Sequence, residues 1–232
     1  QVEQKNPFET SKVKRKLNTN DCRILFLYPN ERGMSTIPPS ITALSQILKD
    51  EGHQTALFDT TFYKFDDEIT IEDSEVTKAK SLENRPVLER DDDDIHFKKT
   101  TRSAVLDFET SIENFKPDFI AVSCTETTFL RAIKLIEKTR HKNIKNLFGG
   151  VFPTFAPDLV MNYKNVDMVC VGEGENAIID LANSISNNED YSNVTNLWIR
   201  QNDGTITKNS ISRPVDIDEI PPVTDIGLFG EK

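Results

Sequence analysis

The sequence contains few cysteines. Cys22, Cys124 and Cys170 are the three cysteines among 232 residues, and they stand far apart. This spacing suits neither a disulfide framework nor a Cys-x-x-Cys metal site. Because Cys124 and Cys170 end apolar stretches, we expect reduced, buried thiols that pack as small hydrophobic side chains.

The sequence also lacks a long apolar run. No stretch reaches the roughly 18 apolar residues of a membrane helix, and the N-terminus is polar and basic, without a signal-like segment. We therefore expect a cytoplasmic protein without a membrane span. Hydrophobic residues make up 37% of the chain, which is enough for a core. The first residue is Gln1 and not Met, which indicates a processed chain or a fragment, and we favour a fragment.

Positive charge is scarce as well. The net charge is −10, and residues 64–94 hold 12 acidic against 5 basic residues, ending in Asp91-Asp92-Asp93-Asp94. Clustered aspartates can bind cations, but such a run is more often a solvated loop, so we predict a mobile acidic insertion over residues 64–100. A basic face of the kind that binds nucleic acid is missing, and no nucleic-acid partner is expected.

Apolar strands and amphipathic helices alternate over most of the chain. The expected strands are 23–28, 54–58, 119–123, 144–148 and 166–171. The expected helices run from Pro38-Pro39-Ser40 to Gly52 and over 104–115, 128–140, 157–162 and 175–185. Residues 1–20 show no apolar period and predict an extended N-terminal arm.

This order of elements predicts the fold class. Strands that are apolar throughout and alternate with helices indicate an α/β fold whose parallel sheet is covered on both faces. We predict a flavodoxin-like or Rossmann-like doubly wound sheet of five strands in the order 2-1-3-4-5, with ligands beyond the carboxyl ends of the strands. Residues 189–232 follow as a β-hairpin around Gln201-Asn202-Asp203-Gly204 and a connector through Pro221-Pro222 towards a missing domain.

Three strand ends carry unusual residues. The fourth predicted strand is followed by Gly149-Gly150. Glycine tolerates positive φ and has no Cβ, so a ligand can approach the backbone closely there. A second ends on the hydroxyls of Ser123 and Thr125, and a third ends on Gly172-Glu173-Gly174-Glu175. We expect the three ends to share one crevice. A plain structural interpretation stays open, because glycines also make tight turns, hydroxyls cap helices and carboxylates suit helix N-termini.

Together these features resemble a known family. Residues 21–222 are similar to the cobalamin-binding domain that stands in front of radical S-adenosylmethionine enzymes, with the α/β domain itself at 21–188. The resemblance rests on the order and spacing of Pro29 and Pro38-Pro39, Gly52-His53, Lys116-Pro117-Asp118 with Ser123 and Thr125, Gly149-Gly150 with Pro153-Thr154, Gly172-Glu173-Gly174-Glu175, and Asp203-Gly204 before Ile220-Pro221.

The resemblance implies a cofactor site. In such domains the corrin ring lies over the strand ends, and the nucleotide tail descends into a groove beside the hydroxyl and double-glycine turns. Hydroxyls can bond amide and phosphate groups, and glycines leave space for a flat benzimidazole. The implied cobalamin-binding residues are Tyr28, Asp59, Thr61, Ser123, Thr125, Gly149, Gly150, Phe152, Pro153, Thr154, Gly172, Glu173, Gly174 and Glu175. No catalytic residue and no metal ligand is expected among them.

One position departs from the pattern of many cobalamin proteins, which place a histidine two residues after the aspartate that ends the second strand. Here Asp59-Thr60-Thr61 puts a threonine there, and Lys64 replaces a later glycine. A threonine hydroxyl is a poor substitute for imidazole as a cobalt ligand, so we expect a base-off form without a histidine ligand. The histidines His53, His96 and His141 are expected at the surface.

The resemblance also implies a parent enzyme. Its downstream radical SAM barrel, on the same polypeptide, would bind a [4Fe-4S] cluster and S-adenosylmethionine, and methyl transfer is the commonest reaction. This sequence has no Cys-x-x-x-Cys-x-x-Cys motif, so the fragment alone is not expected to be catalytic. The alternative is a stand-alone module in which cobalamin or another small ligand switches a partner surface. A phosphoacceptor receiver fits poorly, because it needs two or three carboxylates at the strand ends and a lysine after the fifth strand. Here the first strand ends in Tyr28-Pro29 and the fifth in Gly172-Glu173, so Asp59 lacks these companions.

Overall fold

The structure is a computed structural model that describes residues 21–30, 37–63, 100–216, 218, 220 and 225–230. The predicted N-terminal arm, the acidic insertion up to residue 99 and His96 lie outside the described residues. Parts of the predicted connector lie outside them too.

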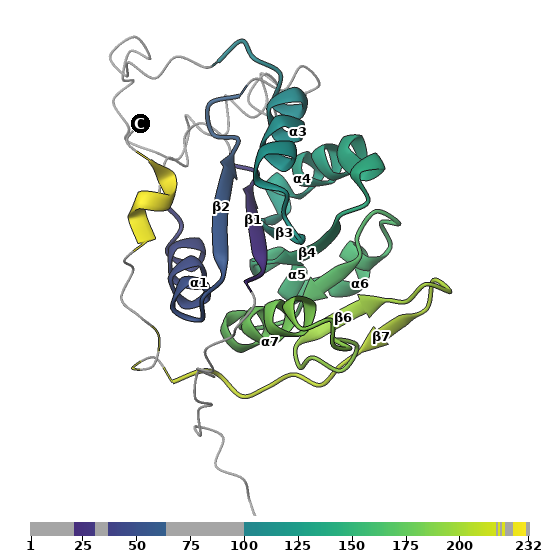
Figure 1. The fold of residues 1–232 in the computed structure, drawn as a ribbon. Helices are drawn as coiled ribbons and strands as arrows, with labels where there is room; N and C mark the ends of the chain where they lie inside the picture. Colours follow the sequence, from purple (N-terminus) through teal and green to yellow (C-terminus); the bar gives the residue numbers. More distant parts are fainter. Residues whose placement is uncertain are drawn as a thin grey trace, which may run out of the picture.

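Strands and helices alternate as the sequence predicts (Figure 1). The strands are β1 (Arg23–Tyr28), β2 (Gln54–Asp59), β3 (Phe119–Ser123), β4 (Lys145–Gly149), β5 (Met168–Cys170), β6 (Leu197–Arg200) and β7 (Ile206–Lys208). The helices are α1 (Pro39–Asp50), α3 (Ala104–Phe115), α4 (Glu126–Thr139), α5 (Val151–Phe155), α6 (Pro157–Met161) and α7 (Glu175–Ser186), with 3-10 turns η3 (Arg140–Lys142) and η5 (Asp225–Phe229).

All of these strands form one mixed sheet. Its order is β2-β1-β3-β4-β5-β6-β7, and β1 to β5 are parallel, so the predicted order 2-1-3-4-5 is confirmed. The predicted hairpin forms as β6 and β7, but it does not stand apart from the sheet. It pairs antiparallel with β5 through Met168 opposite Ile199 and Cys170 opposite Leu197, and so extends the sheet to seven strands.

Helices cover both faces of the sheet (Figure 1). Side chains of a strand alternate between faces, and β1 shows this directly. Ile24 and Phe26 are buried with α1 and α7 on one face, whereas Leu25 and Leu27 are buried with α3, α4 and α6 on the other. The doubly wound prediction therefore holds at the level of single side chains.

Three details of the helices differ from the sequence prediction. α5 follows Gly150 directly and was not expected, because Pro153 lies inside this short helix. Leu130 belongs to the apolar period that predicts the helix 128–140, but its side chain is 62% exposed on α4, while Phe129 and Ile133 are buried. α4 begins earlier than predicted, because Thr125 is its N-cap. The backbone N–H of Thr125 donates a hydrogen bond of 3.0 Å to Thr128 Oγ1.

The C-terminal turn η5 returns to the first part of the chain and lies beside α1 and β2 (Figure 1). The carboxylate of Asp225 accepts hydrogen bonds from Ser45 Oγ and from Lys49 Nζ on α1. The ring of Phe229 meets the ring of Tyr28 edge-on, with 6.4 Å between the centroids. η5 is therefore part of the folded domain.

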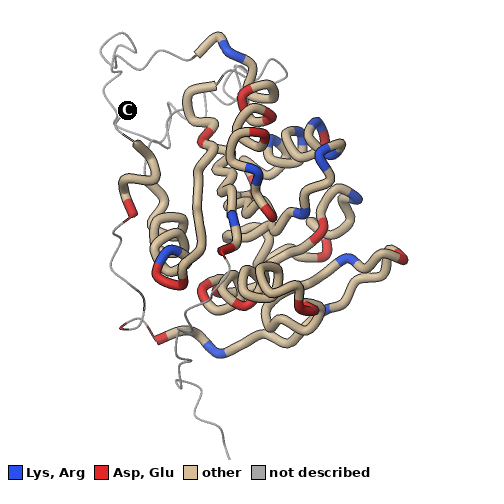
Figure 2. The backbone as a smooth tube through the Cα atoms, in the orientation of Figure 1, with Lys and Arg blue, Asp and Glu red and all other residues tan. Residues whose placement is uncertain are grey.

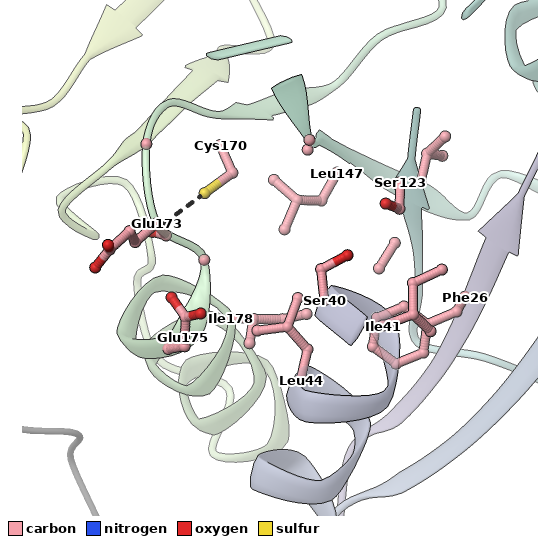
Figure 3. A pocket seen from close by; sticks show the side chains of 16 residues that line it. Phe26, Ser40, Ile41, Leu44, Ser123, Leu147, Cys170, Glu173, Glu175 and Ile178 are labelled. Atoms are coloured by element: carbon pink, nitrogen blue, oxygen red, sulfur yellow. Dashed lines mark hydrogen bonds between the residues drawn. The ribbon is translucent and has the colours of Figure 1, made fainter. Parts of the chain in front are cut away.

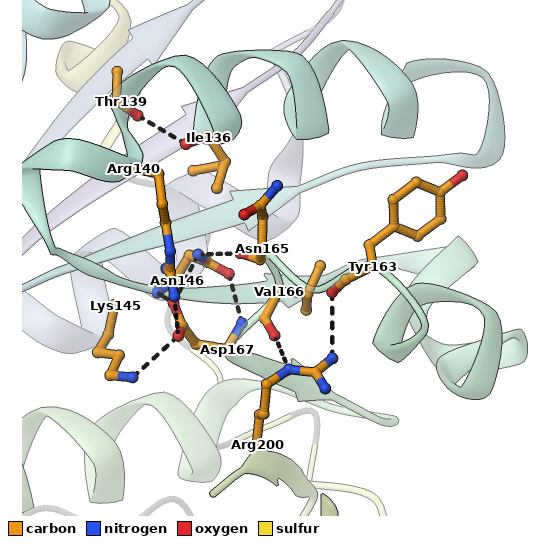
Figure 4. Close-up of polar contacts among 10 residues, drawn as sticks. All are labelled: Ile136, Thr139, Arg140, Lys145, Asn146, Tyr163, Asn165, Val166, Asp167 and Arg200. Carbon is orange, nitrogen blue, oxygen red and sulfur yellow. Dashed lines mark hydrogen bonds and ion pairs between the residues drawn. The ribbon is translucent and has the colours of Figure 1, made fainter. Parts of the chain in front are cut away.

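A polar cluster ties together the amino ends of β4 and β5 (Figure 4). The buried carboxylate of Asp167 accepts from Arg140 Nη1 at 2.7 Å, from Lys145 Nζ at 3.1 Å and from the backbone N–H of Asn146 at 3.1 Å. Burial alone would raise the pKa of Asp167, but the hydrogen bonds from Arg140 and Lys145 outweigh it and hold the pKa below its usual value. Arg200 of β6 completes the edge by donating from Nε to Val166 O at 2.9 Å.

The surface charges of the described residues are mixed. Figure 2 shows Lys and Arg along α4 and the turn after it, interspersed with Asp and Glu, which also mark α3 and α7. Among the helices that the structure describes, none is long and apolar enough to cross a membrane. All three cysteines are buried and free, and burial raises the pKa of Cys124 and of Cys170 to about 12, which suits the predicted inert thiols.

Candidate cofactor-binding site

A cavity of about 210 Å³ opens at the carboxyl ends of β1, β3, β4 and β5, on the face covered by α1 and α7 (Figure 3). This is the edge at which doubly wound sheets bind their ligands. The walls are mainly apolar and come from both helices and the central strands. The lining residues are Phe26, Ser40, Ile41, Leu44, Ala121, Val122, Ser123, Leu147, Gly149, Gly150, Cys170, Gly172, Glu173, Gly174, Glu175 and Ile178.

The two adjacent glycines differ in their surroundings. Gly150 has φ +106°, and a Cβ atom there would lie 2.6 Å from the carbonyl oxygen of Cys124. Gly149 ends β4, and the nearest atoms to a Cβ there are Cys170 Cβ at 3.8 Å and Val122 O at 3.9 Å, which is ordinary contact distance. Gly150 is therefore required by the turn itself, whereas Gly149 leaves space along the wall of the cavity.

The turn from Gly172 to Glu175 forms the opposite wall. Gly172 has φ +92°, and its backbone N–H donates to Thr154 Oγ1 at 3.2 Å. The backbone carbonyl of Glu173 accepts from Asn196 Nδ2 at 2.8 Å, and its carboxylate accepts from the backbone N–H of Val215. The turn is thus held to α5, to the start of the hairpin and to the connector, which gives the cavity a rigid rim.

Glu175 begins α7 and projects beside Glu173 and Ile178 at the cavity (Figure 3). Its Oε2 atom is buried and has no hydrogen-bond partner among the described residues. Burial raises the pKa of this carboxyl, and the nearby charge of Glu173 acts in the same direction, against the opposing effect of backbone hydrogen bonds at the helix start. A buried carboxyl oxygen without a hydrogen-bond partner costs stability, so this atom makes Glu175 a candidate functional residue.

The structure brings half of the predicted residues together at this cavity. They are Ser123, Gly149, Gly150, Gly172, Glu173, Gly174 and Glu175. Thr154 supports the rim through Gly172. Thr125 and Phe152 point elsewhere: Thr125 is exposed at the N-terminus of α4, and the ring of Phe152 packs 5.1 Å from that of Phe129 on the other face of the sheet. Pro153 is buried within α5.

The remaining three predicted residues lie at the ends of β1 and β2. Thr61 is 5% exposed, donates from Oγ1 to Asp59 Oδ1 at 2.5 Å and accepts from Asn30 Nδ2 at 3.0 Å. Tyr28 is half-buried beside Phe229, and burial raises its pKa. These side chains are near the carboxyl edge of the sheet but do not line the cavity.

The histidine prediction needs correction at one position. His53 was expected at the surface, but it is 4% exposed. Its Nδ1 accepts the backbone N–H of Cys22 at 3.1 Å, and its Nε2 lies 3.2 Å from Asn183 Oδ1 on α7. Burial lowers the pKa of His53, so the ring joins β1 and α7 as a neutral group at the amino edge of the sheet. His141 is exposed after α4, as expected.

Several residues of the cavity were not predicted. Ile41 and Leu44 belong to the apolar face of the predicted first helix and Phe26 to the predicted first strand, and all three line the cavity. The sequence signal for them is the amphipathic period that also indicates ordinary core packing, so it does not separate a core position from a cavity wall. Ile178 was missed for the same reason, whereas Ser40 was assigned only to the start of the first helix.

Comparison with known proteins adds to this geometry. Residues 87–182 match the model of the B12 binding domain, over a region that runs from before α3 into α7. This part of the chain is similar to a B12-binding domain. This match covers three of the strand ends at the cavity, and cobalamin is the cofactor that a B12-binding domain implies. No curated protein matches the chain.

Solved structures with similar folds match a larger part of the chain than the model of the B12 binding domain does. The radical S-adenosylmethionine methyltransferase TsrM from Kitasatospora setae, with cobalamin and a [4Fe-4S] cluster bound, matches 87% of this chain at 16% identity and a TM-score of 0.54. The cobalamin-dependent S-adenosylmethionine radical enzyme OxsB, with aqua-cobalamin and S-adenosylmethionine bound, matches 89% at 15% identity and a TM-score of 0.57. The chain spans 31% and 24% of these two proteins, respectively, and identities this low establish the fold alone.

The residues of the cavity suit the tail of this cofactor. A flat aromatic base needs apolar walls, an approach without side chains and a small number of polar contacts. The cavity offers the walls of Phe26, Ile41 and Leu147, the bare strand end at Gly149, and the unpartnered oxygen of Glu175.

Proposed function

We propose that this domain binds cobalamin with the nucleotide tail in the cavity between the sheet, α1 and α7 and the corrin ring over the carboxyl ends of the strands. The observation that carries the proposal is the cavity itself, because Gly149-Gly150, Ser123 and the turn 172–175 converge there on apolar walls. Gly149 would admit the base, while the hydroxyls of Ser123 and Thr154 and the N-terminus of α7 would meet the polar groups of the tail.

We further propose that the cofactor is bound base-off and without a histidine ligand from this domain. Thr61 stands where many cobalamin proteins have the histidine, and its hydroxyl is already engaged with Asp59 and Asn30. Of the two histidines that the structure describes, His53 is buried between β1 and α7 at the amino edge, and His141 follows α4 at that same edge. Neither lies near the carboxyl ends of the strands.

The role proposed for the whole protein is that of the cofactor-carrying domain of a radical SAM enzyme, most readily a methyltransferase. TsrM is a radical S-adenosylmethionine methyltransferase, and OxsB is a cobalamin-dependent S-adenosylmethionine radical enzyme. Cobalamin supplies a cobalt centre that can carry a methyl group, and the domain's own residues hold and orient the cofactor. The catalytic barrel, with its cluster and S-adenosylmethionine, is proposed to belong to the same polypeptide.

The experiment that tests cobalamin binding is titration of the purified chain with hydroxocobalamin, followed by desalting, cobalt analysis and visible spectroscopy. We expect about one cobalt retained per chain and a base-off spectrum. Absence of retained cobalt at micromolar protein would contradict the proposed function. A base-on spectrum with cobalt retained would contradict only the proposed binding mode.

A pair of variants locates the site. Gly149→Val places a side chain into the cavity and should weaken binding by about ten-fold or more, because the base and the new methyl groups would compete for the same space. Thr125→Ala is the matched control, since Thr125 lies outside the cavity wall. Equal affinities for both variants would show that the tail binds elsewhere.

A further inference from the structure

Glu175 differs from the other polar residues around the cavity in having an unused buried atom. The Glu173 carboxylate accepts from Val215 N–H, and the Cys170 thiol donates to Glu173 O at 3.7 Å. Ser40 is exposed and Ser123 half-buried, so water can reach their hydroxyls. Oε2 of Glu175 is buried and has no partner among the described residues. Because Glu175 lines the cavity, a group that enters from the cavity side can complete the hydrogen bonding of its carboxyl.

The protonation state of Glu175 determines what kind of group that is. Burial raises the pKa of the carboxyl, and the adjacent Glu173 adds to the effect. Cys170 and Glu173 are the other titratable side chains of the described cavity wall, and neither supplies a positive charge that would favour the ionised form. Glu175 therefore stays neutral over a wider pH range than an exposed carboxyl and can donate a hydrogen bond.

We propose that the neutral carboxyl of Glu175 donates a hydrogen bond to the ring nitrogen of the tail base, the atom that becomes free when the base leaves cobalt. The flat base is the part of the tail that apolar walls accommodate, and this nitrogen is its acceptor. Glu175 is then a specificity residue that favours cobamides with a nitrogen heterocycle. This inference rests on the proposed cobalamin binding.

The test compares two ligands and two proteins in one cycle. Cobalamin carries a benzimidazole base, whereas p-cresolyl cobamide carries a phenolic tail without a ring nitrogen but keeps the ribose and the phosphate. Dissociation constants are measured for both, as Co(II) forms under anaerobic conditions, with the wild type and Glu175→Met. The free-energy cost of releasing the base from cobalt is the same for both proteins. It therefore cancels when the ratio of the two dissociation constants in the wild type is compared with that ratio in Glu175→Met.

We expect Glu175→Met to reduce the preference for cobalamin over p-cresolyl cobamide by about three- to ten-fold, the value of one buried hydrogen bond. Equal weakening of both ligands would assign Glu175 a merely structural role, or a contact to the ribose or phosphate, and would overturn the inference. Failure of the wild type to bind either cobamide would instead refute the proposed function.

Glu175→Gln provides the second measurement, because it is isosteric and its amide remains a neutral donor at every pH. We expect it to keep the wild-type preference on the acidic side of the Glu175 titration. As the pH rises and Glu175 ionises, the wild-type preference should decline, while that of Glu175→Gln stays flat. The same pH profile in both proteins would overturn the inference, even if Glu175→Met does not fold.

Discussion

Two neighbouring glycines show how much a single residue's surroundings decide. Gly150 adopts φ +106° with no room for a Cβ beside Cys124, whereas Gly149 has ordinary space around its Cα and faces the cavity. The sequence shows two equivalent residues, but only Gly149 can be changed without disturbing the turn. Substitutions at Gly150 therefore report on folding, and substitutions at Gly149 report on the site.

The first prediction follows from this contrast. Gly150→Ala should lower the melting temperature by several degrees, because the alanine would be strained at positive φ and would clash with Cys124 O. Gly149→Ala should melt within about one or two degrees of the wild type, since its Cβ meets no atom closer than 3.8 Å. Thermal denaturation of the two variants measures the difference. Equal losses would show that both positions serve only the turn.

The buried His53 predicts a pH dependence. Its pKa is lowered in the folded protein, so the unfolded chain binds the proton more readily near the ordinary histidine pKa of about 6.5. The stability contributed by neutral His53 is therefore complete above that pH and is lost as the pH falls through and below it. We expect the melting temperature of the wild type to fall more between pH 7.5 and 5.5 than that of His53→Gln. Parallel curves for the two proteins would contradict this.

At the scale of elements, the Asp167 cluster holds β4, β5 and η3 together at the edge opposite to the cavity. Its carboxylate is almost fully buried and accepts charged and backbone hydrogen bonds at the same time. Such a cluster contributes to the framework and leaves the cofactor edge free for other residues.

The second structural prediction concerns this cluster. Asp167→Asn should lower the free energy of unfolding by about 2 kcal/mol, because Arg140 and Lys145 lose a charged acceptor. Lys142→Ala is the control, since its pair with Glu113 is at the surface and should contribute little. Urea denaturation measures both. A variant of Asp167 as stable as the control would show that the cluster does not support the sheet.

Most elements could be predicted from the sequence because their physical signals are local. The apolar strands β1 and β3 and the turn at Gly204 are examples. Contacts between distant elements leave no such local signal. The pairing of β6 with β5 and the burial of His53 against Asn183 depend on tertiary packing. The residues of α1 and β1 that line the cavity could not be predicted either, because apolar residues of a cavity wall and of the core recur with the same spacing in the sequence.

At the scale of the whole molecule, the two residues that flank the segment 64–99 lie side by side. Tyr63 and Thr100 form a parallel bridge, and the backbone N–H of Thr100 donates to Phe62 O at 2.8 Å. A short connection can therefore join these ends without moving β2 or α3.

We accordingly predict that replacing residues 64–99 by a short Gly/Ser linker leaves the fold and the proposed cobalamin affinity unchanged. The entropy of loop closure varies only slowly with loop length, and neither end of the segment lines the cavity. Circular dichroism, thermal denaturation and cobalamin titration of the shortened chain provide the check. Loss of binding with the fold intact would assign this segment a part in holding the cofactor.

The position of the cavity between α1 and α7 has a consequence for the newly made chain. These helices come from the two ends of the domain, yet they contact each other over one face of the sheet and both supply walls. During synthesis the first wall emerges from the ribosome long before the second. A ligand can therefore bind in this cavity only after α7 has been translated and has docked on the sheet. The bound ligand then contacts two helices that are far apart in the sequence and holds them together without a covalent bond.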